Sequence, residues 1–284
     1  QKHSFISNGN PIIQRENLFD ECLSELASVI SLPDNLDFVI SVCDRCHLEN
    51  LSAPILVFNK LKDNKFTPNI PDIYMLSGQT QNIVNQIQVA NLHFSWEKKI
   101  PSAFFRGSTT GFCGGDWMQT PRGKLVATSA SSPYLDAKFT NLVQGAESNN
   151  LMKKFLFTYS LWESPVSPSK SINNRYLIVL DGNVNAWSRA EWALSSNCAV
   201  LMQEGSPYVM WWYKTLKPFI HYIPFNYDVS NIIETIMWAE NNQEEAQKIA
   251  ENGRQLILKE ITVDHAFAYL YLVLKKYSEL LRKS

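Results

Sequence analysis

Long apolar runs are missing from this 284-residue sequence, and none approaches the ~20 residues that a bilayer-spanning helix needs. Residues 1–10 are polar and lack the apolar stretch of a secretory signal peptide. The net charge of −1 excludes an overall basic footprint for a long nucleic acid and a polybasic membrane anchor. We therefore expect no transmembrane segment and no nucleic-acid partner. A signal cleaved before Gln1 is an alternative that the sequence leaves open.

Cysteine is also scarce. The five cysteines are Cys22, Cys43, Cys46, Cys113 and Cys198. So small and odd a number in a chain of this length favours a reducing compartment over a disulfide scaffold. We therefore expect a cytoplasmic protein.

Several ligand-binding motifs are absent. The sequence has no G-x-G-x-x-G, no Walker loop and no H-E-x-x-H, and the first absence argues against a dinucleotide-dependent oxidoreductase. It also contains no Asp-x-Asp, the carboxylate pair with which many sugar-nucleotide enzymes hold Mn²⁺ against a diphosphate. An enzyme of that class without the pair must offset the diphosphate charge with arginines and backbone donors. We therefore expect no bound metal and no obligatory cofactor.

The residues that are present predict alternating strands and helices. Hydrophobic residues make up 45% of the chain and charged residues 19%, which is typical of a globular core. Short apolar runs predict buried strands at 38–42, 54–58, 103–105, 176–180, 199–202 and 219–223. Helical spacing predicts helices at 18–30, at 187–194, at 232–239 after a Ser230 cap, from an Asn242–Glu245 capping box toward Lys259, and after a Thr262 cap. Such alternation indicates an α/β fold with parallel sheets. The charged segment 96–101, which ends in proline, is the predicted domain junction.

The strongest local motif is an apolar strand that runs into Arg106, Gly107 and the hydroxyls of Ser108, Thr109 and Thr110. Glycine permits close approach of the backbone, and arginine with hydroxyls suits phosphate oxygens. Ligands of doubly wound sheets bind at the carboxyl ends of strands, where this motif lies. The alternative is a strand-ending turn with a surface arginine.

A second strand ends in a loop that contains Gly182 and leads to Arg189. A helix is expected to begin near Asn185, and its amino terminus offers N–H groups to a phosphate. Arg189 would lie in the first turn, where its charge opposes the helix dipole. This placement indicates a bound anion, and the alternative is a solvated arginine.

Together these segments resemble glycosyltransferase family 90, which contains protein O-glucosyltransferases of EGF repeats, fungal capsule xylosyltransferases and bacterial lipopolysaccharide-modifying relatives. The resemblance runs from about Asp37 nearly to the carboxyl terminus. It is carried by Phe105-Arg106-Gly107-Ser108, Leu135 to Thr140, Arg175-Tyr176-Leu177 with Gly182, Ser188-Arg189, Leu216 to Pro224, and Ala250 to Gly253.

The resemblance implies a GT-B-like fold, in which two Rossmann-like domains face a cleft. Residues 1–95, with 263–284 packing back, would form the acceptor domain, and residues 100–262 the UDP-sugar domain. It implies an inverting, metal-independent transfer from a UDP-sugar to a hydroxyl of a glycan or glycoprotein by a monomer. A catalytically inactive UDP-sugar- or glycan-binding module is the alternative.

The resemblance also implies roles for single residues. Arg106, Ser108 and Arg189 match positions near the UDP diphosphate. The further candidates for donor binding are Gly107, Thr109, Asp136, Gly182, Asn185, Ala186, Trp187 and Ser188. Asp72 matches the general base, Asp44 is the second candidate, and the alternative for Asp72 is a helix N-cap.

The sequence departs from the family pattern in places. Asp181 stands where many relatives carry arginine, and aromatics that would grip an EGF domain are not recognisable. The short form without a visible signal resembles bacterial or viral members that act on glycans in the cytosol. Glucose and xylose differ only by a hydroxymethyl group, and we favour xylose as the donor sugar.

Overall fold

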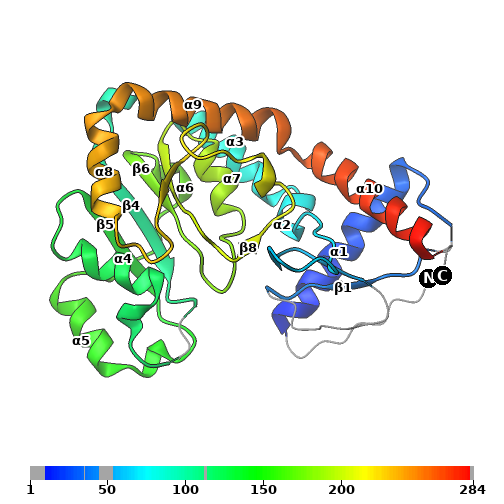
Figure 1. Ribbon diagram of the computed structural model, residues 1–284, viewed down its shortest axis with the longest axis horizontal. Coiled ribbons are helices and arrows are strands. Elements are labelled where there is room, and N and C mark those ends of the chain that lie inside the picture. Colours follow the sequence, from blue (N-terminus) through cyan, green and yellow to red (C-terminus); the bar gives the residue numbers. More distant parts are fainter. Residues whose placement is uncertain (1–9, 35, 45–53, 112–113, 282–284) are drawn as a thin grey trace. The chain divides into compact units, whose positions relative to one another are not determined.

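Figure 1 shows the computed structural model, which describes residues 10–34, 36–44, 54–111 and 114–281. Cys46, Cys113 and most of the polar amino-terminal segment lie outside these ranges. The chain forms two compact units. The first comprises Gln1–Gln81, Pro207–Tyr213 and Glu260–Ser284, and the second comprises Asn82–Ser206 and Lys214–Lys259. The division falls at Gln81–Asn82, inside a helix, and therefore differs from the junction expected at 96–101.

The first unit is built on short strands. β1 (Val39–Ser41) and β2 (Ile55–Val57) pair in parallel, and β3 (Lys60–Leu61) pairs antiparallel with β8 (Tyr208–Val209). Its helices are α1 (Asn10–Val29), α2 (Ile73–Leu76) and α10 (Val263–Leu281). In α10 the hydroxyl of Tyr277 donates to the Pro54 carbonyl at 2.9 Å, which ties the last helix to the residue before β2.

The second unit is a five-stranded, all-parallel sheet (Figure 1). Its strands are β4 (Ile100–Ser108), β5 (Leu135–Asn141), β6 (Asn174–Val179), β7 (Ala199–Gln203) and β9 (Ile223–Phe225). Its helices are α4 (Pro121–Ser129), α5 (Asn150–Thr158), α6 (Pro168–Ser171), α7 (Arg189–Leu194), α8 (Ile232–Asn241) and α9 (Gln243–Glu260), while α3 (Gln79–Asn91) spans the division. Four short 3₁₀ helices lie at Trp96–Lys98, Trp117–Gln119, Ala146–Ser148 and Tyr213–Thr215. The core is rich in aromatics, for example Trp96 against Tyr176 and Trp117 against Phe139.

The strand order of this sheet is β5-β4-β6-β7-β9. The chain therefore starts near the middle at β4, goes to one side for β5 and then crosses back to β6. In such doubly wound sheets, ligands bind at the switch point between the two strands whose connections run to opposite sides. The switch point here lies at the carboxyl ends of β4 and β6.

Apolar runs predicted most of the strands correctly, and the mixed α/β class with parallel sheets is confirmed. The strand expected at 219–223 is wrong, because residues 217–222 form a turn in which Phe219 has φ 57° and its N–H donates to the Tyr222 carbonyl. Only Ile223 of that run belongs to β9. The strand β5 was not predicted.

Two predicted helix caps are also corrected. Asn231, not Ser230, precedes α8, and the Ser230 hydroxyl donates to Asp228 at 2.7 Å. Asn242 ends α8 and directly precedes α9, where the predicted helix begins, but its side-chain amide donates back to the Trp238 carbonyl at 2.8 Å. The Thr262 cap is confirmed, since its hydroxyl accepts from the His265 N–H at 3.3 Å. In the part of the chain that the structure describes, no helix combines the length and apolarity needed to span a bilayer.

Candidate functional site

The loops that follow β4 and β6 meet at the switch point. A Cβ on Gly111 would lie 3.0 Å from the carbonyl oxygen of Gly182. A Cβ on Gly182 would in turn collide with the Thr110 hydroxyl. The two glycine-containing motifs found in the sequence are therefore in contact, and each glycine is required by the close approach of the other loop.

The loop after β5 joins them. The Asn183 side-chain oxygen accepts from the Gly111 N–H at 3.0 Å and from the Gln144 amide at 2.9 Å. The Thr109 hydroxyl donates to the Val143 carbonyl at 3.0 Å and accepts from the Val143 N–H at 2.8 Å. Thr109 is buried, and its hydroxyl both donates to and accepts from Val143, so it joins the two loops.

Asp181 anchors the loop that leads to Arg189. Its buried carboxylate accepts from the Asn185 amide at 3.2 Å and from the Ser206 hydroxyl at 2.5 Å, and its N–H donates to Gln203 at 3.0 Å. The Asn185 amide also donates to Ser206 at 3.3 Å. Asp181 therefore holds the loop, and the predicted donor-binding residue Asn185 has its amide nitrogen committed to that task.

Arg189 is the first residue of α7, later than the start expected near Asn185. Its guanidinium lies over the rings of Phe105 and Trp192, with centroid distances of 5.1 and 5.6 Å, and donates to the Arg106 carbonyl at 2.5 Å. None of the ion pairs among the described residues involves Arg189. Burial lowers its pKa to about 10, so this is a partly dehydrated cation without a carboxylate partner.

The residues before Arg189 bring its side chain to this position. Ser188 has φ 57°, a left-handed conformation that is uncommon outside glycine, and makes no side-chain capping bond. The Arg189 N–H donates to the Trp187 carbonyl at 2.7 Å. Ala186, Trp187 and Ser188 are each half-buried along this turn. Strained backbone of this kind is concentrated at functional sites.

Arg122 was not among the predicted residues. Its guanidinium donates to the carbonyls of Asp181 at 2.9 Å, Ser108 at 2.9 Å and Leu180 at 3.3 Å. Burial and the neighbouring charge of Arg189 lower its pKa to about 9. The signal that could have found it is the one used for Arg189, an arginine in the first turn of a helix, here after the Thr120 cap of α4.

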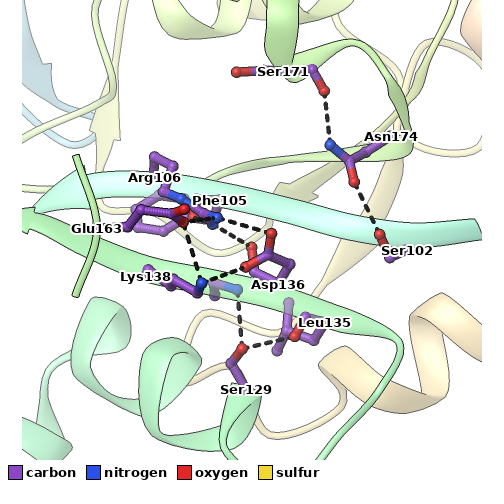
Figure 2. A network of polar contacts seen from close by, with 11 residues as sticks. Ser102, Phe105, Arg106, Ser129, Leu135, Asp136, Lys138, Glu163, Ser171 and Asn174 are labelled. Carbon is purple, nitrogen blue, oxygen red and sulfur yellow. Dashed lines mark hydrogen bonds and ion pairs between the residues drawn. The ribbon is translucent and has the colours of Figure 1, made fainter. Parts of the chain in front are cut away.

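Arg106 and Asp136 take a different role from the one predicted (Figure 2). Arg106 donates to the carboxylates of Asp136 at 2.8 Å and Glu163 at 2.5 Å, and Lys138 lies 3.2 Å from Glu163. Although burial opposes it, Lys138 and Arg106 lower the pKa of Glu163. Successive side chains of β4 point to opposite faces of the sheet, so Arg106 lies on the face opposite Phe105, with its guanidinium over the Phe104 ring.

The guanidinium of Arg106 faces away from the second loop, and its predicted role in donor binding stays a prediction. All hydrogen bonds of its guanidinium go to Phe105, Asp136 and Glu163, and none reaches the loop 181–189. Its charge is already paired, and only its carbonyl takes part in the switch point, as the acceptor for Arg189. The Asp136 carboxylate is likewise part of this ion-pair network.

Asp72 is fully buried and caps α2. Its Oδ1 accepts from the N–H groups of Tyr74 at 2.9 Å and Met75 at 3.2 Å. Burial raises its pKa to about 6. With no exposed surface in this structure, Asp72 offers no direct approach to an acceptor hydroxyl, and its predicted role as general base stays a prediction. Asp72 has the geometry of the alternative, a helix N-cap.

Asp44, the second candidate base, is accessible. It follows the carboxyl end of β1, and its side chain is 36% exposed. Arg15 lies 2.9 Å from its carboxylate and also donates to the Val42 carbonyl at 3.0 Å. Of the two predicted carboxylates, Asp44 is the one with exposed surface.

The described residues contain no group of three or more His, Cys, Asp or Glu side chains that could hold a metal ion. The predicted independence from metals and cofactors stays a prediction.

Known proteins resemble this chain in sequence and in fold. Protein O-glucosyltransferase 2 of Danio rerio is 29% identical over 271 residues, and protein O-glucosyltransferase 3 of Mus musculus is 28% identical over 273 residues. Each alignment covers 92% of this chain but only 50% of the relative, so the chain spans about half the length of these curated relatives. A glycosyltransferase of Rickettsia africae superimposes over 99% of this chain and 85% of its own, with a TM-score of 0.50 at 10% identity, which is a likeness of fold alone.

The fold is thus the α/β, GT-B-like architecture expected from the sequence. The family model described as "Glycosyl transferase family 90" matches residues 63–284. This range includes both switch-point loops, Arg122 and Arg189. The chain belongs to glycosyl transferase family 90.

Proposed function

We propose that this chain is an inverting glycosyltransferase that moves a sugar from a UDP-sugar to a hydroxyl of a glycan or glycoprotein. The observation that carries the proposal is Arg189, a half-buried guanidinium at the switch point of a doubly wound sheet, without a carboxylate partner among the described residues. A diphosphate would supply the missing negative charge. Arg122 adds a second positive charge at the same place. Burial and the nearby charge of Arg189 lower the pKa of Arg122.

Arg189 suits the chemistry of departure, and the positive charge of Arg122 lies beside it. Transfer breaks the bond between the anomeric carbon and the diphosphate, and the leaving UDP takes the electron pair. A charge-assisted hydrogen bond to a phosphate oxygen contributes about 1.5–3 kcal/mol, and donors that are already oriented stabilise the developing charge most. This arrangement supports a metal-independent reaction.

Asp44 is the proposed general base. In an inverting transfer one carboxylate suffices, since the acceptor oxygen attacks the anomeric carbon directly and its proton passes to the carboxylate. Asp44 is half-exposed, and Arg15 fixes its orientation through a 2.9 Å ion pair. Asp72 supports α2 and takes no proton in this scheme.

The sugar is proposed from the relatives. Both matched vertebrate proteins carry the name O-glucosyltransferase, which favours glucose over the xylose favoured by sequence reasoning. A measurement of UDP release from UDP-glucose and UDP-xylose, with a hydroxyl acceptor and with water alone, tests the proposal. We expect the wild-type protein to release UDP from one of the two donors, and we expect Asp44→Asn to suppress that release. UDP binding without release from any sugar donor would instead identify a binding module.

A further inference from the structure

The strands on either side of the switch point separate before they end. The ladder between β4 and β6 continues only to the pair Phe104 and Leu177, whereas β4 pairs with β5 as far as Ser108. Alternate residues of a strand direct their peptide groups to the same neighbour. Because Ala103 and Thr109 donate toward the β5 side, the carbonyls of Arg106 and Ser108 are left facing the side from which β6 has departed.

Two arginine side chains occupy these open positions. Arg189 donates to the Arg106 carbonyl at 2.5 Å, and Arg122 donates to the Ser108 carbonyl at 2.9 Å. Arg122 reaches further, because its other nitrogens donate to the carbonyls of Leu180 and Asp181 beyond the end of β6. It therefore bridges the gap that the sheet leaves open, in place of ladder hydrogen bonds.

One glycine from each motif lies against the Arg122 guanidinium. A Cβ on Gly182 would lie 2.8 Å from Arg122 Nη2, and a Cβ on Gly107 would lie 3.4 Å from Nη1. The Phe105 ring lies 5.7 Å from the Arg122 guanidinium. Gly182, predicted as a ligand-binding residue, thus has a second reason to be glycine, since a Cβ there would collide with Arg122. At Gly107 the obstacle is instead the Phe105 ring, 2.7 Å from a Cβ.

We infer that Arg122 is a positioning residue, which clamps the two phosphate-binding loops at the spacing that a UDP diphosphate requires. Three of its five N–H groups donate to backbone carbonyls, so its hydrogen bonds hold the two loops together. The planar fork of arginine can reach three carbonyls at once, whereas a lysine ammonium is a single point charge. The inference rests on the proposed function only for its ligand, UDP.

The test compares Arg122→Lys and Arg122→Gln by calorimetric titration with UDP. Both variants are expected to lose about ten- to a hundredfold in UDP affinity, the effect of misplacing one or two charge-assisted contacts. Arg175→Lys is the matched control. Arg175 is also buried and donates to Glu240 at 2.8 and 2.9 Å, but it contacts neither loop, so this control should lose thermal stability and keep wild-type UDP affinity.

Hydrogen exchange without UDP provides a readout that does not depend on the ligand. In Arg122→Lys, peptides covering 105–111 and 180–186 should exchange faster than in wild type, and those of the control should not. The clamp would be overturned if Arg122→Lys bound UDP with wild-type affinity. In particular, weak UDP binding in Arg122→Gln beside normal binding in Arg122→Lys would show that a positive charge alone suffices. If Arg122→Gln does not fold, Arg122→Lys decides. Wild-type protein that binds no UDP refutes the proposed function, while the exchange rates still decide the clamp.

Discussion

Arg15 Nη1 lies 2.9 Å from Asp44 Oδ1, and the same guanidinium donates to the Val42 carbonyl at 3.0 Å. The arginine of α1 therefore fixes a carboxylate to the end of β1 without burying it. A general base must be held where an acceptor hydroxyl can meet it, and this ion pair holds a half-exposed carboxylate in one orientation. This relationship distinguishes Asp44 from Asp72, which is fully buried and occupied as a cap.

Substitution of the two aspartates should have opposite effects on activity. Asp44→Asn should lower the transfer rate by about 10²–10⁴-fold, the usual contribution of a general base, and leave UDP affinity unchanged. Asp72→Asn should keep both, because asparagine caps a helix about as well as aspartate. Initial rates of UDP release at saturating donor measure this. A slow Asp72→Asn beside an active Asp44→Asn would return the base to Asp72.

Asp72 should also make stability depend on pH. Burial raises its folded-state pKa to about 6 from an ordinary 3.8, so the folded state binds the proton more tightly than the unfolded state. The associated stability is complete below about pH 4 and is lost as the pH rises through 6, by about 1–3 kcal/mol. Urea unfolding between pH 4 and 7 measures it. Asp72→Asn should flatten this component, and an unchanged pH profile in the variant would refute the assignment.

Arg106 should be a stability residue. Arg106→Gln removes the partner of Asp136 and Glu163, whose side chains are 39% and 44% exposed, so we expect a loss of about 1–3 kcal/mol rather than the larger cost of an isolated buried charge. UDP affinity should stay within about twofold, because the Arg106 carbonyl that holds Arg189 is retained. Denaturant unfolding and calorimetry separate the two. Stable protein with weak UDP binding would restore the phosphate role.

UDP should bind without a divalent metal. The described residues provide arginines and no carboxylate cluster at the candidate site, so the affinity in EDTA should equal that in Mn²⁺. Paired calorimetric titrations in the two buffers compare the dissociation constants directly. A collapse of affinity in EDTA would show that a metal carries the diphosphate charge.

The sequence predicted correctly those strands that contain a continuous run of apolar residues. Apolar runs predicted β6 and β7 because both strands are buried along their whole length. The same rule missed β5, an edge strand in which buried Leu135, Ala137 and Phe139 alternate with the polar Asp136 and Lys138. Alternation of this kind is itself a strand signal.

Roles that depend on tertiary contacts could not be predicted from the motifs. Arg106 and Arg189 have the same chemistry and both follow or precede a glycine-containing loop, but only the folded chain shows that Asp136 and Glu163 pair with the first. Arg122 lies in a segment with no motif, and its three acceptors come from two other loops. Asp72 could be a base or a cap in the sequence, and the folded chain shows it buried as the cap of α2.

The central claim is that a UDP diphosphate binds at the switch point on Arg189. Parallel calorimetric titrations of UDP into wild type and Arg189→Ala test it most directly, with melting temperatures to establish that both proteins are folded. The loss of a charge-assisted contact of about 1.5–3 kcal/mol predicts UDP affinity about ten- to a hundredfold weaker in the variant. A folded Arg189→Ala protein that binds UDP as tightly as wild type would contradict the account.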